Sequence, residues 1–329
     1  MQELYLEQPG RLVLREQVPL PAPGPGQVAL KVLYGGICGS DLSAFKGRIA
    51  YAKYPSRAGH EALGVVKAVG EGAPFTVGQK VVTFPNTFCD ECEFCRAGKT
   101  NVCKNKQSFG LNAPGMFAGE LLVDHRFLVQ VPDALPDMRA VLTEPFAVIV
   151  HAFKKAGIGP GMSVAIVGCG TVGLLSAVLA SHLGAETTIL YNRHKHDAIT
   201  AQIDGLRVVQ AQEIGDEQFD VVVEAAGVKR SVEQAMQLAK PGGALLALGI
   251  TGEQIDFPVI RIVRSEITLY GSIIYTKDDF ADALRYLSEP SLPIDSIVSQ
   301  VRPLADYQAA YEAAMSGEFA KIVLDFQQI

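Results

Sequence analysis

The sequence predicts an α/β protein in which a mostly-strand region precedes a doubly wound parallel sheet. Residues 1–146 consist mainly of short alternating strands and turns, residues 147–274 alternate apolar strands with helical stretches, and a glycine-rich turn at 168–173 follows the first of those strands. Strands that alternate with helices are typical of a parallel sheet covered on both faces. A chain of 329 residues is long enough for two such domains.

The hydrophobic pattern predicts the elements in order. In the first region, a proline-rich loop at 19–26 precedes predicted strands at 27–34, 63–69 and 80–84. In the second region we expect a helix at 172–183 and strands at 163–167, 187–191, 207–210, 220–223, 244–248 and 267–270. Helices at 277–287 and 304–316 and a strand at 321–325 follow.

One crossover of the parallel sheet is predicted to be short. Only 27 residues separate Asn192 from Asp220, and they must hold a helix, a strand and a connection. We therefore expect a loop in place of a full helix before the fourth strand, and a less covered sheet face there.

The composition excludes several partners. A net charge of −6 argues against nucleic acid. No apolar run approaches the roughly 20 residues of a membrane helix, so no membrane partner is expected. The N-terminus lacks a basic-then-apolar signal pattern. Together with metal-spaced cysteines, this favours the cytoplasm.

Four of the six cysteines cluster in one polar segment, the cysteine lobe (residues 86–106). Their spacing is C-x2-C-x2-C-x7-C, and they are Cys89, Cys92, Cys95 and Cys103. Four thiolates can close around one zinc ion and leave no open position, which makes a structural site. The alternative, a loop of free thiols, is disfavoured because crowded reactive thiols are a liability unless something binds them.

The turn at 168–173 has the G-x-G-x-x-G pattern of dinucleotide-binding proteins. Gly168 permits the tight turn, Gly170 lets the backbone approach a pyrophosphate, and Gly173 allows close packing of helix and strand. Thr171 and Val172 open the helix, whose N-terminal N–H groups attract phosphate. The alternative is a glycine-rich turn without a ligand.

The end of the second parallel strand favours NADP(H) over NAD(H). An acidic residue about 20 positions past the glycines would bind the adenosine ribose, but this chain has Asn192, followed by Arg193, His194 and Lys195. Asn192 does not repel a 2′-phosphate, and we expect Arg193 and Lys195 to attract one. The alternative is a solvated basic loop.

A second set of residues has the chemistry of a reactive metal site. Cys38 and His60 supply a thiolate and an imidazole, which suit zinc, and three protein ligands with an open position make a Lewis acid. Glu144 is the best third ligand, directly or through water, and Glu61 is an exchange ligand. Asp41 can accept the other ring N–H of His60. Taken singly, such residues are more often core or surface side chains.

Together these motifs resemble the zinc-containing medium-chain alcohol and polyol dehydrogenases. The matching segments, in order, are Cys38-Gly39-Ser40-Asp41, Gly59-His60-Glu61, the four cysteines, Glu144-Pro145 and residues 168–173. The resemblance implies a GroES-like catalytic domain at 1–146, a Rossmann domain at 147–274, and a return of 275–329 to the first domain. It also implies a homodimer or homotetramer with two zinc ions per chain.

The resemblance implies hydride transfer between a secondary alcohol and the nicotinamide. The zinc ion would polarise the substrate hydroxyl, Ser40 would accept its proton and pass it towards the nicotinamide ribose, and Glu61 and Asp41 would support the site. The nearest subgroups act on sorbitol, threonine, galactitol phosphate and sugar acids, because Glu144 stands where liver-type enzymes have a cysteine ligand.

The substrate positions depart from the family pattern. Phe109 resembles a pocket wall, and Tyr275 matches the tyrosine of the sorbitol-type Arg-Tyr pair, whose arginine is replaced by Ile274. This replacement argues against sorbitol itself. Lys46, Arg48 and Arg57 are candidates to bind an anionic sugar acid or sugar phosphate, with solvated surface charges as the alternative.

The same motifs have alternative functions. A threonine-type amino alcohol or a simple secondary alcohol would use the same chemistry. A zinc-free reductase is disfavoured by Cys38, His60 and Glu144. A non-catalytic NADP(H)-binding protein is disfavoured by the intact reactive metal set.

Overall fold

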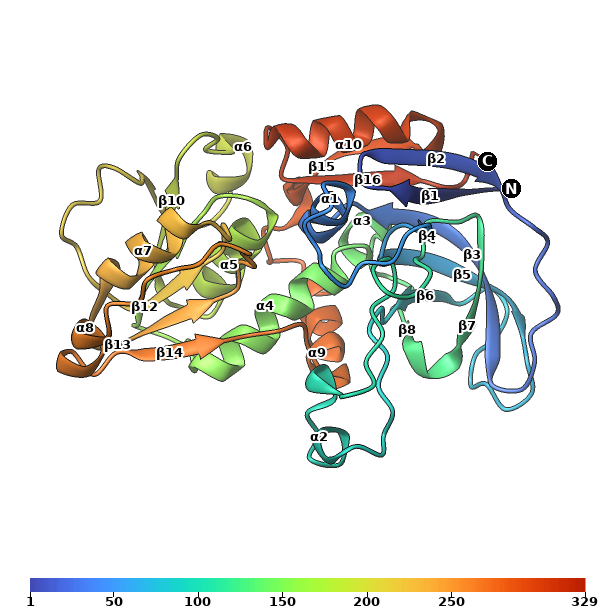
Figure 1. Cartoon of the computed structure of the whole chain (residues 1–329), viewed down its shortest axis with the longest axis horizontal. Helices are drawn as coiled ribbons and strands as arrows, with labels where there is room; N and C mark the ends of the chain where they lie inside the picture. Colours follow the sequence, from blue (N-terminus) through green and yellow to red (C-terminus); the bar gives the residue numbers. More distant parts are fainter. Residues whose placement is uncertain (329) are drawn as a thin grey trace. The chain divides into compact units, whose positions relative to one another are not determined.

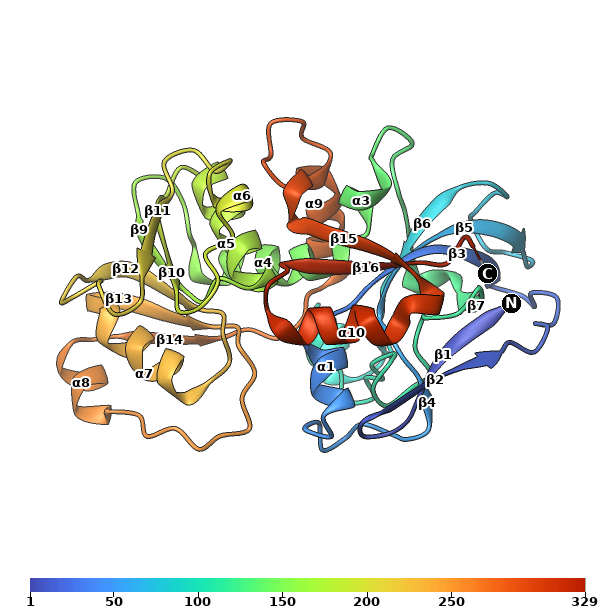
Figure 2. The same ribbon diagram turned by 90° about the horizontal axis from the view of Figure 1, so that it is seen from above.

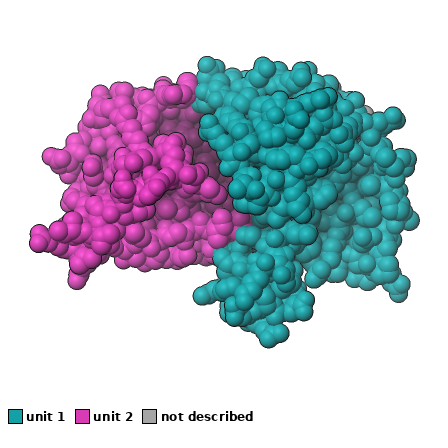
Figure 3. Space-filling model, viewed as in Figure 1, with its two compact units in different colours: residues 1–144, 276–288, 298–329 teal, residues 145–275, 289–297 magenta. Residues whose placement is uncertain are grey.

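The computed structural model describes residues 1–328, which form two compact units coloured separately in Figure 3. Unit 1 comprises residues 1–144, 276–288 and 298–328, and unit 2 comprises residues 145–275 and 289–297. The change between units falls at Glu144 and Pro145, two residues before the expected position. Residues 289–297 group with unit 2, so the C-terminal return to unit 1 is interrupted.

Unit 1 is built on a seven-stranded sheet of order β15-β16-β3-β5-β6-β8, with β7 also paired to β3. Its strands are β3 (Gln27–Gly36), β5 (Glu61–Val69), β6 (Lys80–Thr83), β7 (Glu120–Asp124), β8 (Leu128–Gln130), β15 (Val298–Pro303) and β16 (Lys321–Asp325). In Figure 2, helix α10 (Tyr307–Ser316) runs alongside β15 and β16. The C-terminal strand β16 pairs antiparallel with β3, which brings residues almost 300 positions apart side by side.

The remaining elements of unit 1 are short. A second sheet joins β1 (Gln2–Gln8), β2 (Arg11–Glu16) and β4 (Ser56–Arg57). The helices are α1 (Gly39–Phe45), α2 (Glu93–Arg96), α3 (Asp137–Ala140) and α9 (Lys277–Leu287). The predicted helix at 304–316 begins with a 3-10 turn, Leu304–Asp306, before α10.

Unit 2 is a six-stranded parallel sheet of order β11-β10-β9-β12-β13-β14, which confirms the predicted α/β fold class. Its strands are β9 (Ser163–Val167), β10 (Glu186–Tyr191), β11 (Arg207–Gln210), β12 (Phe219–Glu224), β13 (Ala239–Ala247) and β14 (Thr268–Gly271). Its helices are α5 (Thr171–His182), α6 (Asp197–Thr200), α7 (Lys229–Leu238) and α8 (Val259–Arg264), and α4 (Thr143–Ala156) crosses the division between units. Figure 1 shows the sheet and its helices.

Two details of this sheet bear on the sequence analysis. Residues 211–218 connect β11 to β12 through turns and contain no helix, as the short spacing predicted. Strand β13 begins at Ala239, five residues before the predicted start. The Pro-Gly-Gly segment at 241–243 has the composition of a turn, so the sequence predicted that the strand begins after it. In the structure Ala239 already pairs with Phe219, and the register of the two strands then shifts.

The core of unit 2 lies between the sheet and its helices. Fully buried strand residues such as Val167 and Val222 pack with Ala235 and Met236 of α7. Burying such side chains stabilises the fold by about 1.5–3 kcal/mol for each larger one. Among the helices within residues 1–328, none is long and apolar enough to cross a membrane.

Candidate metal centres and dinucleotide site

The register of two strands brings Cys38 and His60 together. Strands β3 and β5 pair antiparallel, with Gly36 opposite Glu61. Cys38 follows the end of β3, and His60 precedes the start of β5, so both lie at the same end of the strand pair. The ligand atoms of Cys38, His60 and Glu61 all lie within 4.8 Å of one another. A thiolate, an imidazole and a carboxylate at this separation fit a zinc ion.

Asp41 fixes the orientation of His60 and Cys38. Its Oδ1 atom lies 3.2 Å from His60 Nδ1, the contact predicted from the sequence, and its Oδ2 atom accepts a hydrogen bond from the Cys38 amide at 2.9 Å. A hydrogen bond at Nδ1 leaves Nε2 of His60 for a metal. Ser40 Oγ lies 3.3 Å from that Nε2 atom.

The charge of Asp41 also acts on the His60 ring. Burial by itself lowers the pKa of His60, but the charge and hydrogen bond of Asp41, with a smaller contribution from Cys38, outweigh it and place that pKa well above its usual range. A metal ion at Nε2 competes with a proton for that atom.

Glu61 is paired with Lys321, the first residue of β16. Both side chains are almost completely buried, with 0% and 1% of their surface exposed. Lys321 Nζ donates a hydrogen bond to Glu61 Oε1 at 2.5 Å. Gly36 makes room for this pair, because a Cβ atom there would lie 2.0 Å from Glu61 Oε2.

Glu144, the third ligand expected from the sequence, is not one of the three donors that converge within 4.8 Å. It lies in the first turn of α4 and is 7% exposed. Burial lowers the pKa of Lys321, but the charges of Glu61, Cys38 and Glu144 together raise it above its usual value. Glu144 thus contributes negative charge around Lys321. Glu61 is the carboxylate that lies within 4.8 Å of the ligand atoms of Cys38 and His60.

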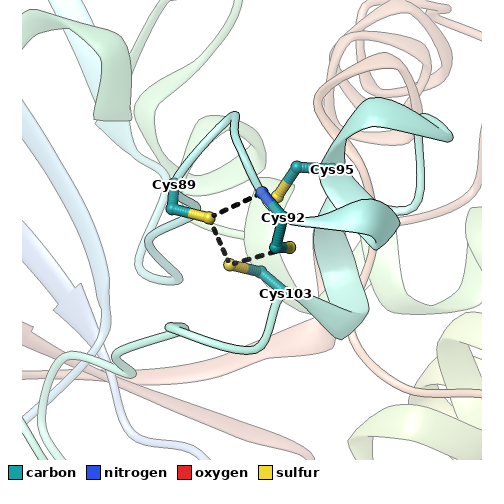
Figure 4. Close-up of side chains that lie close together, drawn as sticks. All are labelled: Cys89, Cys92, Cys95 and Cys103. Carbon is teal, nitrogen blue, oxygen red and sulfur yellow. Dashed lines mark hydrogen bonds between the residues drawn. The ribbon is translucent and has the colours of Figure 1, made fainter.

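The four cysteines of the cysteine lobe converge as Figure 4 shows. The sulfur of Cys103 lies 3.5 Å from that of Cys89 and 4.0 Å from that of Cys92. Four sulfurs bound tetrahedrally at the usual Zn–S distance lie about 3.8 Å apart, so the arrangement fits a zinc ion. Asp90, between the first two cysteines, adopts φ 60°, which turns the loop back on itself.

Backbone N–H groups support these sulfurs. The amide of Cys92 lies 3.4 Å from the sulfur of Cys89, and the amide of Asn105 lies 3.4 Å from that of Cys103. Hydrogen bonds from the backbone of Cys95 and Lys104 lower the pKa of Cys92 to about 6. Such donors stabilise thiolates, the form in which cysteine binds zinc.

The glycine turn in unit 2 has the geometry that a dinucleotide requires. Gly168 has φ +117°, a conformation that favours glycine, and Gly170 is the N-cap of α5. A Cβ atom on Gly173 would lie 1.9 Å from the Gly168 carbonyl oxygen, so only glycine permits this packing. Thr171 and Val172 form the first turn of α5 and are partly exposed.

The turn also lies at the point where the strand order reverses. Strand β9 is flanked by β10 on one side and β12 on the other. In doubly wound sheets, ligands bind at the carboxyl ends of the strands at this point.

The loop after β10 presents the residues expected to select the cofactor. Asn192 and Arg193 are exposed. Within residues 1–328, Arg193 forms no ion pair. In contrast, Lys195 Nζ lies 3.0 Å from Asp197 Oδ1, so its charge is already partly compensated.

The two expected substrate residues differ in accessibility. Phe109 is partly exposed, and its ring packs edge-on against Phe127 at 6.4 Å between centroids. Tyr275 is 0% exposed and is among the largest fully buried side chains. A substrate role for Tyr275 stays a prediction, but its burial favours a packing role.

The sequence analysis did not identify Lys321 or Glu224 as site residues. Lys321 lies 260 positions from its partner Glu61. The one available signal was a lysine that opens a strand whose next three residues are apolar. Glu224 is 0% exposed at the end of β12, and its signal was a carboxylate that ends a run of valines.

Comparisons with known proteins agree with this geometry. The alcohol dehydrogenase GroES-like domain matches residues 24–133, and the zinc-binding dehydrogenase domain matches residues 171–289. A sorbitol dehydrogenase of Halalkalibacterium halodurans is 30% identical over 96% of both chains. The L-galactonate-5-dehydrogenase of Escherichia coli (strain K12) is 29% identical over 95% of this chain and 94% of its own.

Solved structures agree as well. A structure of a zinc-binding dehydrogenase from Sinorhizobium meliloti 1021 bound to NADP matches 98% of both chains, with a TM-score of 0.90 and 28% identity. The match covers both units of the fold.

Proposed function

The chain belongs to the zinc-containing medium-chain alcohol/polyol dehydrogenases, and on this premise we propose that it transfers hydride between a secondary alcohol of the polyol, sugar-acid or sugar-phosphate class and NADP(H). The observation that carries the proposal is the convergence of Cys38, His60 and Glu61 within 4.8 Å, close to a serine hydroxyl.

Each residue of the reactive site has a distinct task. Cys38 and His60 would hold the catalytic zinc, together with Glu61 or Glu144, and the bound ion would supply a Lewis acid for the substrate oxygen. Asp41 holds Nδ1 of the His60 ring, which leaves Nε2 for the ion. Ser40, whose hydroxyl lies 3.3 Å from that nitrogen, would accept the substrate proton while passing its own proton towards the nicotinamide ribose and on to water.

NADP(H) is the proposed cofactor because of the loop after β10. Arg193 is exposed and has no ion-pair partner among residues 1–328, so its guanidinium is available for a 2′-phosphate. The NADP bound to the Sinorhizobium meliloti relative supports this proposal. Asn192, at the end of β10, brings no negative charge that would repel the phosphate.

Kinetics with both cofactors tests this assignment. A charge-assisted contact is worth about 1.5–3 kcal/mol, so Arg193→Ala is expected to lower kcat/KM for NADP about 10- to 150-fold and to change that for NAD by less than about threefold. Lys195→Ala is the matched control, because Asp197 already pairs with Lys195, and its effect is expected to be smaller. A strong NAD preference in the unaltered enzyme would overturn the NADP assignment.

The relatives support the proposed substrate class, and the positive charges near the site bear on an anionic substrate. Arg57 is not available to bind an anion, because its Nη1 lies 3.1 Å from Glu3 Oε2 and its Nε donates to the Gly115 carbonyl. Lys46 and Arg48 stay exposed. A screen of polyols, sugar acids, sugar phosphates and threonine with both cofactors tests the class; exclusive oxidation of threonine would reject it.

Two zinc ions per chain are part of the proposal, one at Cys38 and His60 and one in the cysteine lobe. Metal analysis of the purified protein tests it. A value of one would favour the alternative of a non-catalytic cofactor-binding protein.

We also propose that the chain assembles with a second copy of itself through the edge of the unit 2 sheet. Strand β14 is one of the two edge strands, and apolar side chains on β14 and on the preceding helix α8 are exposed, among them Val259, Ile260, Val263 and Leu269. An unpaired apolar edge is a liability unless it is covered. Light scattering at micromolar concentration tests this, with Ile260→Glu expected to yield monomers; a monomeric parent protein would reject it.

A further inference from the structure

Glu224 is a buried carboxylate that has no role in the proposed hydride transfer. It is the last residue of β12 and is 0% exposed. Strand β12 pairs with β9, and the ladder ends at Glu224 opposite Val167, the residue before the glycine turn. Glu224 therefore lies at the reversal of strand order where a dinucleotide binds.

The Glu224 side chain fixes the connection between β12 and α7. Its Oε1 atom accepts hydrogen bonds from the amides of Ala226 and Gly227, each at 2.9 Å, and from Ser231 Oγ at 2.6 Å. Three donors on one oxygen hold residues 225–228, which we call the β12 loop, in a single arrangement. Hydrogen bonds to a carboxylate are about twice as strong as those between neutral groups.

Glu224 also holds the segment that follows β13. Its backbone carbonyl accepts hydrogen bonds from the amides of Leu248 at 2.9 Å and Gly249 at 3.0 Å. A Cβ atom on Gly249 would lie 2.4 Å from Glu224 Oε2. The carboxylate thus fills the space between two connections at the same edge of the sheet.

The β12 loop packs directly on the glycine turn. A Cβ atom on Gly168 would lie 3.0 Å from Ala226 Cβ and 3.1 Å from the Ala226 amide nitrogen. The amide of Ala225 donates to the carbonyl of Val167 at 3.0 Å. A shift of the β12 loop would therefore move the wall against which the turn is folded.

We propose that Glu224 is a positioning residue for the nicotinamide cofactor: it fixes the β12 loop against Gly168 and so keeps the dinucleotide turn ready to bind. This inference rests on the proposed cofactor role of residues 168–173. If the loop were released, only the fraction of molecules with the loop in place would bind, and the apparent affinity would fall by that fraction.

The test compares variants at the two ends of β12. Glu224→Met keeps the volume but removes every acceptor, whereas Glu224→Gln keeps one carbonyl oxygen for the three donors. Asp220→Asn is the matched control, because Asp220 forms its contacts with Ser163 and Lys240 at the other end of the strand. Cofactor Kd is measured from the nicotinamide fluorescence of NADPH and NADH, because the chain has no tryptophan, and the steady-state KM for cofactor and for alcohol is measured separately.

We expect Glu224→Met to raise the Kd of the preferred cofactor about tenfold, with the KM for alcohol changed less than about twofold. We expect Glu224→Gln to recover most of the affinity, and Asp220→Asn to lower thermal stability without changing Kd. If Glu224→Met does not fold, Ser231→Ala removes one of the three donors and is expected to raise Kd about two- to threefold.

The outcomes separate two failures. An unaltered protein that binds neither NADPH nor NADH would reject the proposed function. An unaltered protein that binds a cofactor, with a Kd unchanged by Glu224→Met, or by Ser231→Ala where Glu224→Met does not fold, would reject the positioning role alone. A Kd raised equally by Asp220→Asn would show a general stability effect and would also reject it.

Discussion

Lys321 Nζ donates a hydrogen bond to Glu61 Oε1 in the interior of unit 1, where neither side chain exposes more than 1% of its surface. The pair joins β16 to β5 and lies beside Cys38 and His60. Ions are costly to bury without a partner. The lysine therefore compensates the charge of a carboxylate that also lies within reach of the metal ligands.

Replacing this lysine tests the compensation. In metal-free protein, Lys321→Met leaves Glu61 buried without a counter-ion and is expected to cost about 3–5 kcal/mol of unfolding free energy. Bound zinc should reduce this loss of unfolding free energy, because the ion then compensates the charge of Glu61. Urea unfolding with and without a chelator measures the unfolding free energy in the metal-free and zinc-bound protein.

The matched control for that experiment is Lys240→Met. Lys240 pairs with Asp220 but is 42% exposed, and exposed pairs contribute about 0–1 kcal/mol. If the Lys321 and Lys240 variants lose equal stability in the absence of metal, the buried pair has no special role.

The two metal centres should be separable by mutation. Cys38→Ser is expected to remove the catalytic zinc and lower kcat at least about 1000-fold, while the cysteine lobe keeps its ion. Cys92→Ser is expected to empty the lobe and expose residues 89–103 to proteolysis, because a structural zinc supplies about 10–16 kcal/mol of binding energy to such a segment.

Zinc per chain, measured by mass spectrometry of the metal, should fall from two to one in each variant. Cys169→Ser is the control, since Cys169 belongs to neither group of converging ligands, and it should keep both ions. Loss of both ions from Cys92→Ser would indicate that the centres are not independent.

Cofactor choice should reverse when a carboxylate is placed at the end of β10. Asn192→Asp is expected to lower kcat/KM for NADP about tenfold or more by repelling the 2′-phosphate, and to raise that for NAD by providing an acceptor for the ribose hydroxyls. Asn192→Ala separates charge from size. An aspartate variant with the cofactor ratio of the parent would argue against a role for this loop.

Asp220 gives a pH dependence of known sign. Hydrogen bonds from Lys240 and Ser163 lower the pKa of Asp220 from 3.8 to about 2. A lowered pKa in the folded state means that the stabilisation is complete above the unfolded pKa and is lost as pH falls from about 4 towards 2. Because Lys240 is 42% exposed, the contribution is about 1 kcal/mol.

Asp220→Asn is therefore expected to be less stable than the parent at pH 7, with the difference about halved at pH 3. Urea unfolding of both proteins at the two pH values measures it. A difference that grows towards low pH would have the wrong sign for this ion pair.

Short-range patterns were sufficient for much of the fold. The alternation of strands with helices defined the parallel sheet, and strand β9 has the bounds that its apolar run predicted. The glycine spacing at 168–173 identified the turn, because each glycine is needed for a local steric reason: the tight turn, the approach of a pyrophosphate or the close packing of helix and strand. The cysteine spacing likewise brought four sulfurs together within a single loop.

Long-range pairing decided the rest. The register of β3 against β5 brings His60 and Glu61 beside Cys38, and the pairing of β16 with β3 places Lys321 next to Glu61. Glu224 gained its partners from the β12 loop and the segment after β13. The sequence by itself determined which residue types can hold metal and dinucleotide. Only the tertiary structure decided which carboxylate lies with Cys38 and His60, because the choice between Glu61 and Glu144 depends on how segments distant in the chain pack together, which no local pattern records.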